Sequence, residues 1–248
     1  ELDGGTYDDY NLKLGMGDAG TLSFSGASSS GSGVDKLKDI VPTAYSAVYE
    51  ATDATDSGLI DASGNNQTGQ WGYDVSVGSV ALSASYNPRG TAQGVAGSAE
   101  TGYAVVYSGL MDGLELSAGY FDDGEQAEND TVGAKYTMGS VTAAYGKAYI
   151  AHALEDATTD FIEDTQNNKA SVSVNVNDDL SVSYIQEKST ANHKTTATTD
   201  VEVKSTSLGA AYTMGGMTLA LALVEHENVG YVANVDVKSS VFNVTLAF

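Results

Sequence analysis

The sequence predicts an all-β chain that folds as a transmembrane antiparallel β-barrel. Three observations predict it. Apolar and polar residues alternate with a period of two in thirteen short segments, tight links alternate with long polar links between them, and aromatic residues gather toward the segment ends. A strand with water on one side and lipid on the other produces this pattern.

The alternation is simplest in residues 20–27, where Leu22 and Phe24 are separated by the polar residue Ser23. Short runs of this type predict strands. In order, the expected strands contain residues 10–16, 20–27, 71–77, 80–86, 103–107, 114–120, 132–138, 141–145, 170–176, 180–184, 208–214, 217–223 and 242–248. Two-faced strands also fit a soluble β-sandwich, so alternation alone does not choose between the two folds.

The links between the strands favour the barrel. The tight links are residues 17–19, 78–79, 109–113, 139–140, 177–179 and 215–216. Every link between these is expected to be longer and polar. Outer-membrane barrels have short periplasmic turns and long external loops in alternation, whereas a Greek-key sandwich does not require this order.

Aromatic residues are expected to form two belts at the edges of the lipid layer. The predicted girdle is Trp71, Tyr73, Tyr86, Tyr103, Tyr107, Tyr120, Tyr136, Tyr184 and Tyr212. Aromatic belts on either side of an aliphatic band are typical of lipid-facing surfaces. The alternative interpretation is that tyrosine is simply common in strands.

Composition excludes several classes of function. The chain has 33 acidic and 11 basic residues and a net charge of −22, which argues against nucleic acid as a partner. It has no cysteine, so it has no disulfide framework.

Gly15 to Gly20 match a dinucleotide-binding pattern, but a strand follows where that motif needs a helix. His152, His193 and His226 fall in predicted links without a partner at metal spacing, so we expect surface histidines.

Residues 28–68 form a link too long for a plain connection. Val34 and Leu37 have a helical spacing that would let the link pack inside the barrel as a pore-constricting loop. The predicted constriction residues are Glu50, Asp53, Asp56 and Asp61, with Lys13 as the facing base. The alternative is a solvated external loop. In another acidic link, Asp122, Asp123, Glu125 and Asp130 are candidate Ca²⁺ ligands, with a solvated acidic loop as the alternative; Glu225 and Glu227 are placed in a further external link.

The C-terminal segment resembles the closing strand of bacterial outer-membrane proteins through Phe242, Val244, Leu246 and Phe248. Residues 12–26 and the loop containing Val48-Tyr49-Glu50 resemble strands four and five and the constriction loop of trimeric sixteen-stranded general-diffusion porins, most like the acidic alphaproteobacterial type. This resemblance implies an integral homotrimer in the outer membrane of Gram-negative bacteria. It implies contact with lipid and lipopolysaccharide, and assembly machinery that reads the terminal signal.

The strand count gives an expectation about the whole protein. The last strand of such a barrel ends in the periplasm, and counting back makes the first strand here the thirteenth from the end. An even-stranded barrel of sixteen would then lack about three N-terminal strands. We expect one β-barrel domain over residues 1–248, with residues 28–68 as its constricting loop.

The expected function is passive diffusion of small hydrophilic solutes and ions with a preference for cations, without enzymatic activity or a required cofactor. A substrate-selective channel is the first alternative, and it would line its interior with an aromatic ladder or a basic track. A secreted or surface-layer β protein is the second alternative, but the sequence has no fixed repeat. An outer-membrane enzyme or autotransporter barrel is the third.

Overall fold

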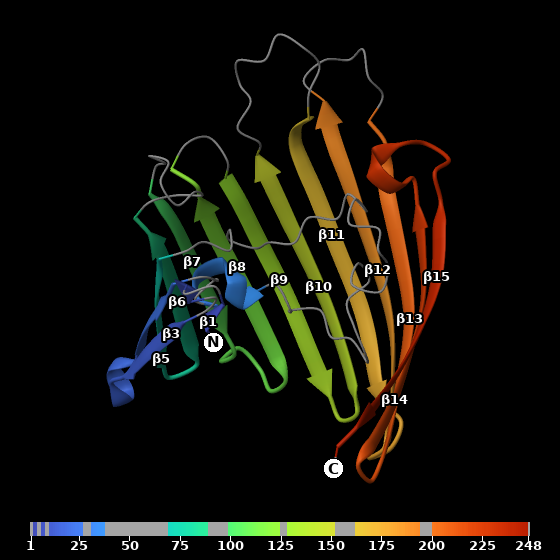
Figure 1. Ribbon diagram of the computed structural model, residues 1–248, viewed down its shortest axis with the longest axis horizontal. Helices are drawn as coiled ribbons and strands as arrows, with labels where there is room; N and C mark the ends of the chain where they lie inside the picture. The colour runs from blue at the N-terminus through green and yellow to red at the C-terminus, as the bar shows by residue number, and fades with distance from the viewer. Residues whose placement is uncertain are drawn as a thin grey trace. The chain divides into compact units, whose positions relative to one another are not determined.

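The computed structural model describes residues 2–3, 6–7, 10–26, 31–37, 69–88, 99–124, 128–151, 162–193 and 200–247. Thirteen strands form one antiparallel sheet in which each strand neighbours the next along the chain (Figure 1). They are β3 (Asn11–Gly15), β4 (Thr21–Ser25), β5 (Gln70–Val77), β6 (Val80–Asn87), β7 (Glu100–Tyr107), β8 (Leu114–Asp122), β9 (Glu128–Met138), β10 (Val141–Ala151), β11 (Ile162–Asn175), β12 (Leu180–His193), β13 (Glu202–Met214), β14 (Met217–Glu227) and β15 (Val237–Leu246). The all-β fold with thirteen strands is confirmed.

The remaining elements are short. Strands β1 (Leu2–Asp3) and β2 (Thr6–Tyr7) pair with each other in a separate sheet. The described residues also form three 3₁₀ helices, η1 (Gly17–Ala19), η2 (Gly33–Leu37) and η3 (Val229–Tyr231). In the described part of the chain, no helix has the length and apolar character to cross a membrane.

The chain divides into two compact units. The first contains Glu1–Asp39, Ala62–Val132 and Ala148–Asp156, and the second contains Ile40–Asp61, Gly133–Lys147 and Ala157–Phe248. Strands β3 to β8 and helix η2 belong to the first unit, and strands β11 to β15 belong to the second.

Tight hairpins join the strands at the links that the sequence marks as short. The first turn residues Gly78, Gly139 and Gly215 have φ angles of 60°, 58° and 59°. The following residue has no positive φ in any of the three turns, which is the type II′ arrangement whose twist matches that of two paired strands. One link predicted to be long, residues 121–131, is reduced to residues 123–127, because β8 continues to Asp122 and β9 already begins at Glu128.

In β5 to β8 the two faces of the sheet differ in chemistry. Register places Tyr73 opposite Ala84 and Tyr103 opposite Tyr120, and these positions carry exposed or partly exposed side chains on what we call the apolar face. The intervening positions form the polar face, where Ser83 is buried. Exposed apolar and buried small polar side chains reverse the order of a water-soluble protein and match a lipid-facing barrel strand.

Strands β11 to β15 show the same division. Tyr184, Leu208 and Phe242 are exposed on their apolar face. Ser189 and Ser205 lie on the polar face of the same strands and are fully buried. The sheet therefore keeps its pattern of one apolar and one polar face in the second unit.

Candidate pore-lining site

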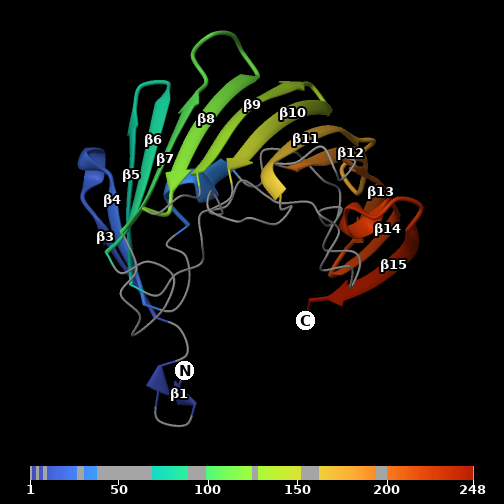
Figure 2. The same cartoon turned by 90° about the horizontal axis from the view of Figure 1, so that it is seen from above.

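Helix η2, from the long link between β4 and β5, lies on the polar face of β6, β7 and β8 (Figure 2, the blue coil beside β7 and β8). Val34 is 0% exposed and Leu37 is 4% exposed. Val34 packs in an apolar cluster with Phe121 and Ala148. Burial of the two aliphatic side chains fixes this segment of the link against the wall, because each buried aliphatic group contributes roughly 1.5–3 kcal/mol.

Missing Cβ atoms let η2 approach the strands closely. Gly33 has φ +68°, and a Cβ atom there would lie 2.9 Å from Ser85 Cβ and 3.0 Å from the carbonyl oxygen of Gly102. A Cβ atom at Gly119, on the strand side, would lie 2.8 Å from Leu37 Cδ1 and 3.1 Å from Val34 Cγ2. Glycine on both sides of the contact is therefore what seats the helix at this depth.

A carboxylate on β5 is the polar anchor of η2. The Ser32 hydroxyl donates to Asp74 Oδ2 at 2.8 Å, and the Ser83 hydroxyl donates to Asp74 Oδ1 at 2.5 Å. The backbone N–H of Gly33 donates to Ser83 Oγ at 2.7 Å. Lys36 Nζ lies 3.5 Å from Asp74 Oδ2. We call these five residues the loop anchor; they join the start of η2 to two strands through one negative charge.

Beside the loop anchor lies a cavity of about 660 Å³ on the polar face. Its charged lining consists of Asp18 of η1 in the β3–β4 turn, Asp74, Glu115 at the start of β8, and Lys36 from η2. Three carboxylates therefore face this space with one ammonium group. The charged lining of this cavity is therefore acidic on balance.

Of the five predicted constriction residues, the structure describes only Lys13. Glu50, Asp53, Asp56 and Asp61 lie outside the described residues. Lys13 is exposed in β3, opposite Ser23. Lys13 was predicted as the base within reach of the loop. Its role as the base facing the four acids stays a prediction, because those acids lie outside the described residues; the basic group of the loop anchor is Lys36, which the loop itself supplies.

The candidate Ca²⁺ ligands are only partly described. Asp122 Oδ1 accepts a 2.6 Å hydrogen bond from the backbone N–H of Gly124, and Glu125 lies outside the described residues. Among the residues that are described, no three His, Cys, Asp or Glu side chains gather closely enough to hold a metal ion. Asp122 and Asp130 lie in β8 and β9 rather than in a link, and Ca²⁺ binding by these residues stays a prediction.

The predicted girdle residues lie on the apolar faces of their strands. Trp71, Tyr73, Tyr86, Tyr103, Tyr107, Tyr136, Tyr184 and Tyr212 are exposed. Tyr120 is less exposed, and its hydroxyl group is hydrogen-bonded to Glu128. In the predicted assembly signal, Phe242, Val244 and Leu246 are exposed on β15, and Phe248 lies outside the described residues.

Three expectations about polar residues were wrong because the strands extend beyond the apolar alternation. His226 was expected at the surface, but it lies in β14 with 0% exposure, and its Nδ1 is 2.6 Å from Ser205 Oγ. Glu225 and Glu227 were expected in an external link, but they also lie in β14. His193 closes β12 rather than lying in a link, and hydrogen bonds from it lower the pKa of Asp200.

No family model matches the sequence, and no curated protein matches it. Solved structures do. In-vitro folded OmpT, an outer membrane protein of Vibrio cholerae, is 12% identical with a TM-score of 0.65, over 96% of this chain and 76% of that one. Salmonella typhi OmpF in complex with daunomycin is 16% identical with a TM-score of 0.63, over 92% and 74%.

A porin refined at 1.8 Å resolution is 18% identical to this chain with a TM-score of 0.61, over 94% of this chain and 79% of that one. At such identities the likeness concerns the fold. The chain has the β-barrel fold of bacterial outer-membrane porins, and it spans about three quarters of the length of these structures.

Proposed function

We propose that this protein is an integral porin of the bacterial outer membrane, through which small hydrophilic solutes and ions diffuse passively. The observation that carries the proposal is the docking of η2 on the polar face, next to a charged cavity of about 660 Å³. A diffusion channel needs a hydrated interior and a structure that narrows it. The exposed apolar face of the same strands supplies the lipid contact that such a channel also needs.

The charges around the cavity support a preference for cations. Asp18, Asp74 and Glu115 outnumber Lys36 in its lining, and the net charge of the whole chain is −22. A water-filled path through negative potential raises the local concentration of cations and lowers that of anions.

Further parts of the proposal concern assembly. We propose a homotrimer that needs no cofactor and has no catalytic role, in contact with outer-membrane lipid and lipopolysaccharide. The exposed residues Phe242, Val244 and Leu246 on β15 are proposed as the signal for the barrel-assembly machinery. Native mass spectrometry of the detergent-extracted protein tests the trimer, and a monomeric mass at all concentrations would exclude it.

Planar-bilayer recording tests the channel and its selectivity. The reconstituted protein should produce discrete conductance steps, and the reversal potential in a salt gradient should have the sign of cation preference. The absence of steps would refute the channel, and anion preference would refute the charge argument.

A pair of variants locates the selectivity. Glu115→Gln removes one carboxylate from the cavity lining and should lower the ratio of cation to anion permeability. Asp178→Asn is the matched control, because it removes the same charge from the β11–β12 turn, whose residues do not line the cavity. Equal reversal potentials for the two variants would contradict a role for the cavity in selectivity.

A further inference from the structure

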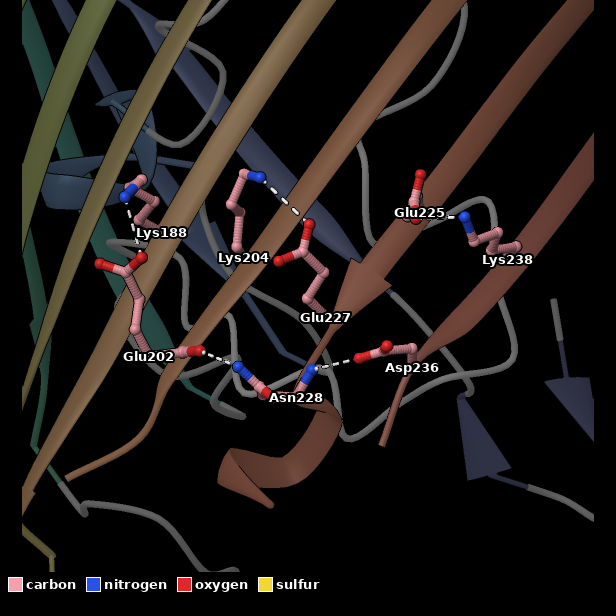
Figure 3. A network of polar contacts seen from close by, with 8 residues as sticks. All are labelled: Lys188, Glu202, Lys204, Glu225, Glu227, Asn228, Asp236 and Lys238. Carbon is pink, nitrogen blue, oxygen red and sulfur yellow. Dashed lines mark hydrogen bonds and ion pairs between the residues drawn. The ribbon is translucent and has the colours of Figure 1, made fainter. Parts of the chain in front are cut away.

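Three ion pairs cross the apolar face of β12 to β15 near the ends that lead to the longer links (Figure 3). We call their six residues the charged row. Lys188 Nζ lies 2.8 Å from Glu202 Oε1, and Lys204 Nζ lies 3.1 Å from Glu227 Oε1. Lys238 and Glu225 form the third pair. The row thus connects four successive strands through their side chains.

The charged row continues the face that carries the lipid-facing residues. Lys188 is an even number of residues from Tyr184 along β12, and Lys204 is an even number of residues from Leu208 along β13, so each lysine lies on the same face as that apolar residue. Each lysine is four residues from its apolar neighbour, about 13 Å along an extended strand. The row therefore lies beyond the exposed apolar band, at the depth where a membrane changes from hydrocarbon to headgroups.

Within the row, register sets two like charges side by side. Lys188 lies directly opposite Lys204 in the pairing of β12 with β13. Like charges at opposed positions destabilise a sheet, and ion pairs as exposed as these contribute only about 0–1 kcal/mol each in water. The side chains are 43% and 33% exposed. Each ammonium group has three donor hydrogens, and one of them points to a carboxylate.

We propose that Lys188 and Lys204 together bind the phosphate group of a membrane lipid, whose acyl chains then lie against Tyr184 and Leu208. The proposal rests on the proposed function, since it places this face in a membrane. Glu202 accepts a hydrogen bond from the Lys188 ammonium group, and Glu227 accepts one from the Lys204 ammonium group. A phosphate between the lysines offsets their repulsion and accepts charge-assisted hydrogen bonds from both.

Native mass spectrometry of the folded protein in non-ionic detergent tests the site. Phosphatidylglycerol and a diacylglycerol with the same acyl chains are titrated separately. The double variant Lys188→Gln with Lys204→Gln should bind phosphatidylglycerol roughly tenfold or more weakly than the unchanged protein, with no change for diacylglycerol. Lys13→Gln with Lys135→Gln is the matched control. It removes two positive charges from the polar face of β3 and β9, whereas the charged row lies on the apolar face. This variant should bind both lipids as the unchanged protein does.

Further arms separate the alternatives. The double arginine variant at Lys188 and Lys204 should keep phosphatidylglycerol binding, because the positive charges remain. Unchanged binding by the double glutamine variant would overturn the proposal. Displacement of the lipid by inorganic phosphate at equal concentration would also overturn it, because that result indicates a site for free anions. Loss of the oligomer by the double glutamine variant in lipid-free detergent would overturn it as well, because that result indicates an interface between copies of the chain. Bilayer recording of the same samples reports on the channel independently, so failure of the lipid site and failure of the proposed function are distinguishable.

Discussion

Lys36 of η2 and Asp74 of β5 form an ion pair, with 3.5 Å between Nζ and Oδ2. Both side chains are partly exposed, at 46% and 30%, so the pair itself contributes only about 0–1 kcal/mol. The carboxylate also accepts hydrogen bonds from Ser32 and Ser83. Those bonds to a charged group are worth about 1.5–3 kcal/mol each, and among the described residues they make Asp74 the main polar attachment of η2.

Asp74→Ala should loosen η2 without unfolding the sheet, because it removes the acceptor of both hydroxyl groups. We expect more frequent transitions between sub-conductance levels and a larger mean step in bilayer recordings. Asp178→Ala in the β11–β12 turn, which leaves the loop anchor intact, should behave like the unchanged protein. Identical noise spectra for both variants would show that Asp74 does not hold the loop.

Gly33→Ala should destabilise the protein more than Gly31→Ala. Both glycines have a positive φ, +68° and +69°, so alanine meets a backbone penalty of about 1–2 kcal/mol at either position. Only the Cβ at residue 33 would press on Ser85, while the Cβ at residue 31 has nothing within 4 Å. The extra overpacking cost is about 1–3 kcal/mol. The temperature at which the folded band disappears on a gel measures it, and equal temperatures for the two variants would contradict the seating of η2.

The pair of Lys169 and Glu187 on the polar face should behave non-additively. Its atoms are 3.0 Å apart, and the side chains are 12% and 2% exposed. Lys169→Met removes the ammonium group that lies 3.0 Å from a buried carboxylate and should lower the free energy of unfolding by about 3–5 kcal/mol, whereas Lys169→Met with Glu187→Met should cost far less. A double-mutant cycle in urea measures this coupling. Additive losses would mean that the two charges act independently.

Tyr231→Phe should destabilise the link between β14 and β15 in a pH-dependent way. The phenol oxygen lies 2.7 Å from Ser189 Oγ, and burial raises the pKa of Tyr231 above 10.0. Stability from a group whose pKa is raised on folding is fully present below pH 10 and is lost as pH rises through the folded pKa.

Thermal unfolding across pH 8 to 12 tests this prediction about Tyr231. The advantage of the unchanged protein over Tyr231→Phe should be about 1 kcal/mol at the lower end and should shrink toward the upper end. A constant difference across this range would contradict the role of the buried phenol.

Local sequence was sufficient where a residue's surroundings follow from its neighbours in the chain. The alternation of Leu22 and Phe24 with serine and threonine predicted a strand, and β4 is one. Gly78-Ser79 predicted a tight turn, and a type II′ turn is observed. The spacing of Val34 and Leu37 predicted packing against a wall, and both are buried.

Prediction failed where strands continue with charged residues in place of apolar ones. The alternation of apolar and polar residues begins at Leu208 in β13 and ends at Leu223 in β14. The sequence therefore predicts links for residues 202–207 and 224–227, which belong to these strands. The ladder nonetheless continues, and it brings Lys204 opposite Glu227. His226 was misplaced for the same reason, since its burial depends on strand length and on what covers the polar face.

By itself, then, the sequence determined the strands, their order, their tight turns and the chemistry of the two faces, because these depend on contacts between near neighbours and on a period of two. Only the tertiary structure decided that η2 reaches β5 through Asp74, that Lys36 supplies the base beside the cavity, and that Lys188 stands beside Lys204. Those pairings join residues from separate strands and links, so they follow from register and from where a long loop docks, which no local pattern encodes.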